Sequence, residues 1–242
     1  MVLLRGVARS RHWHGQRPGT KVVDRHAPAF IQRTVATHAI RLAQYAGHMT
    51  HAVARAVSIL GHPMLVLPLV MLVLATGRGG TGDVLWMGVG FIVFAAVVMA
   101  YSKLQVRRGQ WAHVDASNQE ERKSLNRFLL VALLVSAVLA VSTGMPRELA
   151  LGLGLSAAMV AVAMLTARWC KLSLHMAFVV FAVFLLHVLS WKAAVFGLVF
   201  AAAVAWSRLR LQRHVLRDLL AGTCAGAAAG VAYLLASPGV AG

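Results

Sequence analysis

Four residues near the C-terminal end of the sequence have the types and spacing of a phosphoryl-transfer site. Ser207 and Arg208 come first, His214 follows, and Asp218 stands four residues after the histidine. On one helical face, an aspartate that accepts from one imidazole nitrogen leaves the other nitrogen as a nucleophile. The guanidinium of Arg208 is a planar fork that matches phosphate oxygens. The segment therefore predicts attack of a histidine on phosphorus.

Two further segments offer partners for this chemistry. Lys171, Ser173 and His175 stand at the start of an apolar run, where Ser173 is placed to cap a helix whose backbone N–H groups bind an anion. His175 would then stand beside the anion as a general acid. Upstream, the polar segment from Asp115 to Arg122 adds a second guanidinium. An even number of apolar runs separates the three segments, so we expect them on one membrane face.

Together these segments resemble the three motifs of the type 2 phosphatidic acid phosphatase and vanadium haloperoxidase superfamily, KxxxxxxRP, PSGH and SRxxxxxHxxxD. The third motif is complete in Ser207, Arg208, His214 and Asp218. The second keeps its serine and histidine, with leucine in place of the proline and the glycine. The first keeps only its arginine, Arg122. The resemblance covers about residues 58 to 236, and the third motif is its specific part.

The resemblance implies a membrane phosphatase that works through a phosphohistidine, without a metal ion or a cofactor. His214 would attack phosphorus, Asp218 would orient it, and His175 would protonate the leaving oxygen. The equatorial phosphate oxygens would lie against residues of all three motifs, Arg122, Arg208 and Ser173. The implied substrate is a lipid phosphate or diphosphate monoester, of the phosphatidic acid or polyprenyl phosphate type.

Departures from the family pattern affect phosphate binding. Asp115 takes the lysine position of the first motif, where it repels phosphate unless it pairs with an arginine, and Lys171 is the candidate replacement for the missing charge. Leu174 forbids the positive φ that a glycine allows. His113, Asp115 and Ser207 are candidates for residues that orient the phosphate ligands. The alternative function is therefore a catalytically weakened relative that binds or translocates lipid phosphates.

The elements that carry these residues are membrane helices. With 59% hydrophobic and 13% charged residues, the 242-residue chain is too apolar for a soluble domain. Its uncharged runs match the roughly 20 residues that a helix needs to cross a bilayer. We expect an all-α polytopic bundle of about seven spans that contains a six-helix core like that of the family. The spans cover about residues 57–77, 84–103, 126–144, 149–167, 174–190, 192–207 and 218–236.

Charge orients these spans. Seven spans put the N-terminus and the three motif-bearing loops on one face, which holds 21 of the 24 Lys and Arg. The positive-inside rule makes this face cytoplasmic, in a bacterial inner membrane, although many members of the family carry their motifs on the external face. The rule alone explains Arg210, Arg213 and Arg217. The positive charge predicts contact with anionic lipids rather than nucleic acid, because no soluble domain is long enough to form a groove.

Several features allow two interpretations. Asp218 also suits the dipole of a helix N-terminus. Gly222, Gly226 and Gly230 form overlapping GxxxG repeats, typical of close packing within a chain or of a homodimer. Cys170 is interpreted as a packing residue. Residues 1–56 form a basic N-terminal segment, partly disordered, in which 30–55 suits an interfacial helix, a solvated helix or part of a transit peptide. Residues 57–237 form the transmembrane domain.

Overall fold

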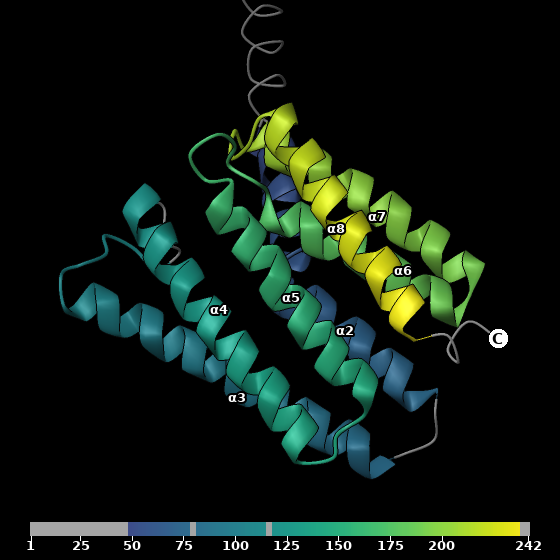
Figure 1. The fold of residues 1–242 in the computed structure, drawn as a ribbon. Coiled ribbons are helices and arrows are strands. Elements are labelled where there is room, and N and C mark those ends of the chain that lie inside the picture. Colours follow the sequence, from purple (N-terminus) through teal and green to yellow (C-terminus); the bar gives the residue numbers. More distant parts are fainter. Residues whose placement is uncertain (1–47, 78–80, 115–117, 238–242) are drawn as a thin grey trace, which may run out of the picture. The chain divides into compact units, whose positions relative to one another are not determined.

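The second of two compact units, residues 48–242, contains all the residues that the structure describes. In this computed structural model they are 48–77, 81–114 and 118–237, and all their regular structure is helical (Figure 1). The first unit, residues 1–47, lies outside them, and so does most of the predicted interfacial helix. Residues 48–55 belong to the helical segment His48–Leu60, which also contains the predicted domain boundary at residues 56 and 57.

Seven more helices follow in chain order, and each overlaps a predicted span, although α2 begins six residues later and α4 seven residues earlier than predicted. They are α2 (Pro63–Thr76), α3 (Thr81–Arg107), α4 (Gln119–Ser142), α5 (Arg147–Leu165), α6 (Leu174–Leu189), α7 (Trp191–Arg210) and α8 (Leu216–Ala236). Five of them, α3, α4, α5, α7 and α8, are long and apolar enough to cross a membrane. The prediction of an all-α integral membrane protein is confirmed.

Two predicted spans differ from simple membrane-crossing helices. The first span is broken, because His48–Leu60 and α2 meet at an angle of 53°, and it counts as a sixth crossing only if this bent pair is one span. Pro63 lacks an N–H and disfavours helical geometry at the residue before it, so the chain turns at His62. The fifth span, α6, has 16 residues. That is about 24 Å of helix, shorter than a hydrocarbon core of about 30 Å.

The short helix α6 is nevertheless the centre of the bundle. It packs against α2, α5, α7 and α8, and most of its side chains from Met176 to Leu185 are buried. Three glycines of α8 make its closest approach possible: an added Cβ at Gly222 would lie 2.5 Å from the Ser173 carbonyl oxygen, and Gly226 and Gly230 face Ala177 and Phe184. The glycine stripe is therefore covered by α6 of the same chain. The homodimer stays a prediction, and this stripe offers it no free surface.

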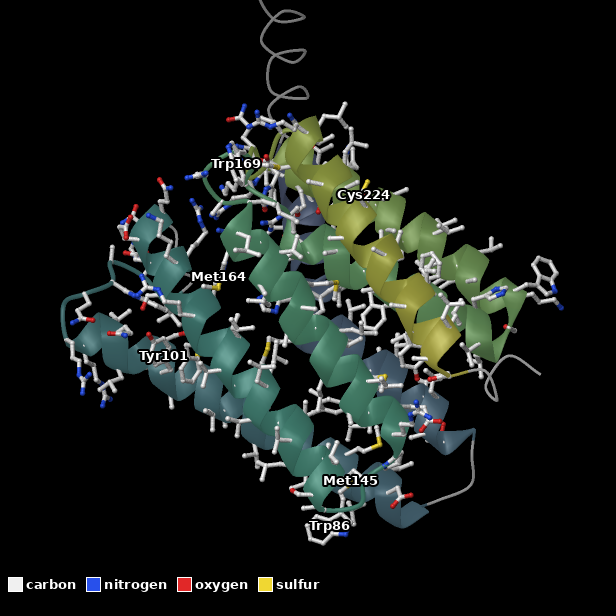
Figure 2. All side chains as sticks on the ribbon, in the orientation of Figure 1. Trp86, Tyr101, Met145, Met164, Trp169 and Cys224 are labelled. Carbon is white, nitrogen blue, oxygen red and sulfur yellow. The ribbon has the colours of Figure 1, made fainter. Side chains whose placement is uncertain are left out.

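Helices α3 and α4 lie at the edge of this core. Few of their side chains are buried, and large apolar residues such as Ile92 and Val138 are exposed. Lipid tails are as apolar as these side chains, so such exposure suits a bilayer. Trp86 and Trp169, both largely exposed, mark opposite ends of the bundle in Figure 2. Tryptophan favours the two membrane–water interfaces, which agrees with the positions of these two residues at the ends of the bundle.

Candidate functional site

The second and third predicted motifs meet where α6 and α8 begin. Because glycines allow α8 to lie against α6, the Ser173 N–H donates to the backbone carbonyl of Asp218 at 3.1 Å. The Lys171 N–H donates to the Asp218 side chain, at 3.2 Å from Oδ1. Two segments about 45 residues apart in sequence are thus joined at one residue, Asp218, through its backbone carbonyl and its carboxylate. Asp218 lies in the first turn of α8 and is 4% exposed.

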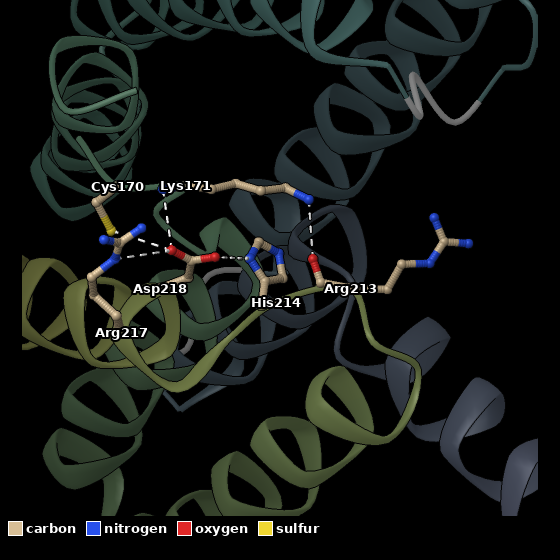
Figure 3. Close-up of polar contacts among 6 residues, drawn as sticks. All are labelled: Cys170, Lys171, Arg213, His214, Arg217 and Asp218. Carbon is tan, nitrogen blue, oxygen red and sulfur yellow. Dashed lines mark hydrogen bonds and ion pairs between the residues drawn. The ribbon is translucent and has the colours of Figure 1, made fainter. Parts of the chain in front are cut away.

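Asp218 holds four groups around one buried carboxylate (Figure 3). Its Oδ2 lies 3.5 Å from Nδ1 of His214, and its Oδ1 lies 4.0 Å from Nε of Arg217. The Cys170 thiol donates to Oδ1 at 3.5 Å. The His214 contact is an electrostatic one, too loose for a well-formed hydrogen bond. The predicted pairing of His214 with Asp218 is therefore present, although α8 begins only at Leu216 and His214 stands in the turn before it.

Burial keeps His214 neutral. Desolvation, followed by the positive charges of Arg208 and Lys171, lowers the pKa of His214 to about 4, and Asp218 opposes the shift. Near neutral pH the ring therefore keeps a lone pair, as a nucleophile requires. Its side chain is 7% exposed. With Nδ1 facing Asp218, Nε2 is the nitrogen left to react.

The side chain of Lys171 extends past Asp218 and His214 toward Arg213 (Figure 3). Its Nζ donates to the Arg213 carbonyl at 3.0 Å. Desolvation lowers the pKa of Lys171, and the charges of Arg122, Arg208 and Arg213 add to this, whereas Asp218 opposes it. Arg122, from the first motif, is thus close enough to act on Lys171. A cluster of cations that disfavour one another's charge is stabilised by a bound anion.

The turn between α7 and α8 sets the position of His214. The Leu211 N–H donates to the Ser207 carbonyl and the Arg213 N–H to the Arg208 carbonyl, each within 3.0 Å, which ends α7 sharply. Gln212 takes the left-handed conformation that such an ending needs, with φ of 52°. Ser207 is fully buried, and its Oγ donates to the Val204 carbonyl at 2.8 Å, so its hydroxyl is used within the helix.

Three buried polar atoms at this end have no hydrogen-bond partner among the described residues. They are Ser173 Oγ, Arg208 Nε and His214 Nδ1. Arg208 is held from the other side, because its Nη1 donates to Ser58 Oγ at 2.9 Å. An unpaired buried donor costs about 1–3 kcal/mol, so such groups imply a ligand or water that satisfies them. The hydroxyl and guanidinium suit oxygen atoms of an anion.

The arrangement of helix ends supports the same conclusion. Three helices begin at this end of the bundle, with His62, Ser173 and Val215 as the residues before their first turns. Helix N-termini carry partial positive charge and free N–H groups, so their convergence favours an anion. His175, in the first turn of α6, contacts the ring of His62 edge-on with ring centroids 5.1 Å apart.

Glu121 lies next to Arg122 in the first turn of α4 and holds the loop that precedes this helix. Glu121 is buried, and its carboxylate accepts from the backbone N–H of Ala112 and of Asn118. Its neighbour Glu120 pairs with Lys123 at 2.6 Å. His113 is exposed. Asp115 lies outside the described residues, so its predicted role is not addressed by the structure.

Sequence reasoning missed three residues of this site: Ser58, His62 and Cys170. The first two come from the broken first span, and the sequence Gly61-His62-Pro63 was the available signal, since it predicts a helix start at a histidine. Cys170 was interpreted as a packing residue, whereas its thiol faces Asp218. Burial, together with this carboxylate, raises the pKa of Cys170, so the thiol keeps the proton that it donates.

The described residues also form a cavity at the opposite end of the bundle, which holds none of the predicted site residues. Its volume is about 140 Å³, and its lining includes Met71, Met87, Asp83, Glu148 and Tyr233. In the described part of the chain, no cluster of three or more His, Cys, Asp or Glu has the arrangement of a metal site. Comparisons with models of known families, with characterised proteins and with solved structures gave no match.

Proposed function

We propose that the protein is a membrane phosphatase that hydrolyses a lipid phosphate or diphosphate monoester through a phosphohistidine. The observation that carries the proposal is the convergence on one end of the bundle of His214 paired with Asp218 and of the unpartnered atoms Ser173 Oγ and Arg208 Nε. Arg208, His214 and Asp218 come from one segment, and α6 brings Ser173 to them from an earlier part of the sequence. Their assembly around one point supports a site built for a phosphate group.

The reaction has two steps. Nε2 of His214 attacks phosphorus, the bond from phosphorus to the leaving oxygen breaks, and that oxygen takes a proton from His175. His175 then removes a proton from water, whose oxygen displaces His214 and releases inorganic phosphate. Arg208, Arg122 and Ser173 bind the equatorial oxygens and neutralise the charge that develops on them. Lys171 supplies the positive charge that the first motif lacks.

The surroundings of the site favour an amphipathic substrate. The site lies at the ends of membrane helices, where a headgroup meets the interface and an acyl or polyprenyl chain enters the lipid. Phosphatidic acid and polyprenyl phosphates have this form. The bundle would contain a six-helix core like that of the type 2 phosphatidic acid phosphatases. The basic residues of this end favour the cytoplasmic face by the positive-inside rule, and the membrane we propose is a bacterial inner membrane.

Phosphate release by the purified protein in detergent, measured on a panel of lipid phosphates, tests this function. We expect His214→Ala to abolish release and vanadate, which mimics the five-coordinate phosphorus, to inhibit the wild type. His51→Ala, at an exposed histidine of His48–Leu60, is the matched control and should retain full activity. Wild-type release by His214→Ala would disprove the phosphohistidine mechanism.

A lipid-phosphate-binding or lipid-translocating protein is the second candidate. Leu174 occupies the position of the motif glycine, and the same unpartnered donors that suit catalysis also suit binding alone. Under this function, lipid phosphates would bind and compete with vanadate, yet the wild type would release no phosphate. Reporter fusions after Gly79 and Gly109 test the orientation, and an external signal from Gly109 would reverse it.

A further inference from the structure

A fourth segment, absent from the three motifs, reaches the proposed site at the break in the first span. Ser58 and His62 are one helical turn apart in sequence, on either side of the end of His48–Leu60. Ser58 is buried and accepts from Nη1 of Arg208 at 2.9 Å. His62 contacts the ring of His175. Arg208, proposed to bind phosphate, and His175, the proposed general acid, thus each contact this segment.

Packing fixes the break in position. A Cβ at Gly61 would lie 2.6 Å from a methyl group of Val204, so only a glycine lets the chain approach α7 this closely. Pro63 then starts α2, and His62 takes an extended conformation with ψ of 133°. Val204 lies one turn before Arg208 on α7. The break therefore sits beside the residues that it contacts.

The backbone also fixes the imidazole of His62. Its Nδ1 accepts from the N–H of Met64 at 3.2 Å, which caps the first turn of α2. In the neutral ring the proton must then be on Nε2. The ring stands edge-on to that of His175, with an interplanar angle of 87°, and is itself exposed.

From the capped imidazole of His62, held edge-on against His175 by the helix break, we infer that His62 is a positioning residue for the proton transfer of the proposed phosphatase. The inference rests on the proposed function. His175 lies in the first turn of α6, and a ring that contacts it edge-on limits its rotation. A general acid must be held within hydrogen-bond reach of the leaving oxygen. His62 thus determines how well His175 protonates that oxygen.

This role has a consequence that a purely structural role lacks. An alkoxide is a poor leaving group and depends on protonation, whereas para-nitrophenolate leaves without it. Loss of the positioning ring should therefore slow hydrolysis of an alkyl phosphate and spare that of para-nitrophenyl phosphate. General acid–base catalysis is worth about 10²–10⁴-fold in rate, so loss of positioning alone should cost about tenfold in kcat/KM for the alkyl ester.

Two substitutions of His62 distinguish the effect of its hydrogen bond to the Met64 N–H from the effect of its ring against His175. His62→Asn keeps a side-chain oxygen that accepts from the Met64 N–H but removes the ring. His62→Phe keeps a ring against His175 but removes the cap. His51→Asn, at an exposed histidine of the preceding helix, is the matched control. The kcat/KM of each purified variant is measured with dodecyl phosphate and with para-nitrophenyl phosphate, and its unfolding midpoint in detergent is recorded.

We expect His62→Asn to lose about tenfold on dodecyl phosphate and less than about twofold on para-nitrophenyl phosphate, with an unchanged unfolding midpoint. His62→Phe should keep most of the wild-type ratio between the two esters and unfold at a lower temperature. Equal losses on both esters for His62→Asn, or no loss on either, would overturn the role of His62 and leave the phosphatase standing. A wild type that releases phosphate from neither ester would overturn both.

Discussion

At the end of the bundle where α6 and α8 begin, positive charges crowd around buried polar atoms that lack partners, whereas the opposite end holds two carboxylates around a cavity of about 140 Å³. Asp218 and Tyr233 mark these ends on α8. They are 15 residues apart, about 22 Å along a helix. This cavity is thus far from the proposed chemistry. Unsatisfied donors, rather than empty volume, identify the end that is prepared for an anion.

Removal of one carboxylate from each end should give the largest contrast. Asp218→Asn should reduce phosphate release by about 10³–10⁴-fold, because the ring of His214 loses the charge that orients it. Asp83→Asn, in the cavity at the other end, should leave release unchanged. The measurement is phosphate release by both variants on the best lipid phosphate. Equal loss in the two variants would mean that the ends do not differ in function.

Glycines distinguish the packed site from the looser parts of the bundle. Gly222→Ala would place a Cβ 2.5 Å from the Ser173 carbonyl, so we expect a cost of about 1–3 kcal/mol in unfolding and a displaced Ser173 with weaker vanadate binding. Gly154→Ala on α5 meets nothing within 4 Å and should be neutral or slightly stabilising. Unfolding in mixed micelles and vanadate inhibition of both variants test this. A Gly222→Ala protein as stable as Gly154→Ala would contradict the close packing of α6 and α8.

Low pH should reduce stability and activity through His214, at the end of the bundle where α6 and α8 begin. Its pKa falls from 6.5 to about 4 in the folded protein, so the folded state binds fewer protons than the unfolded state between these values. The free energy of unfolding should therefore decrease as the pH falls from about 6.5 toward 4, because protons bind preferentially to the unfolded state. The acid limb of kcat/KM should lie near pH 4 as well.

The charge of Lys171 contributes to this shift, so Lys171→Met should move the acid limb to higher pH. Glu148→Gln, at the other end, should not move it. Profiles of kcat/KM against pH for the three proteins make the comparison. An acid limb near 6.5 in the wild type would show that His214 is exposed to water.

The smallest expected difference concerns the turns at the two ends. Gly144 and Gln212 both have positive φ, 69° and 52°, after α4 and α7 respectively. A residue other than glycine pays about 1 kcal/mol for this conformation. Gln212→Gly should therefore stabilise the folded protein by about 0.5 kcal/mol, because the relief of the positive φ is partly offset by the entropy cost of glycine. Gly144→Gln should destabilise the folded protein by about 1 kcal/mol. Unfolding midpoints of the two variants test both signs, and a destabilised Gln212→Gly would point to a side-chain role of Gln212.

The sequence by itself determined the membrane class, the helical spans and the segment from Ser207 to Asp218. Each follows from local rules: apolar runs match the bilayer thickness, and an i, i+4 spacing brings His214 toward Asp218. The sequence also offered a six-helix resemblance and a substrate class, which stay predictions. The prolines of the first span, Pro63 and Pro68, predict a kink there, and the structure breaks the helix just before Pro63.

Only the tertiary structure decided what surrounds the predicted residues. The glycines of α8 place Ser173 against Asp218, and the break at His62 brings Ser58 to Arg208, across 150 residues of sequence. No local pattern encodes such pairs, since they depend on which helix faces fit together at van der Waals distance. The same packing buries His214 and so lowers its pKa. Residue types and their spacing in the sequence predict the chemistry, whereas desolvation of His214 in the folded protein determines the protonation state of its ring.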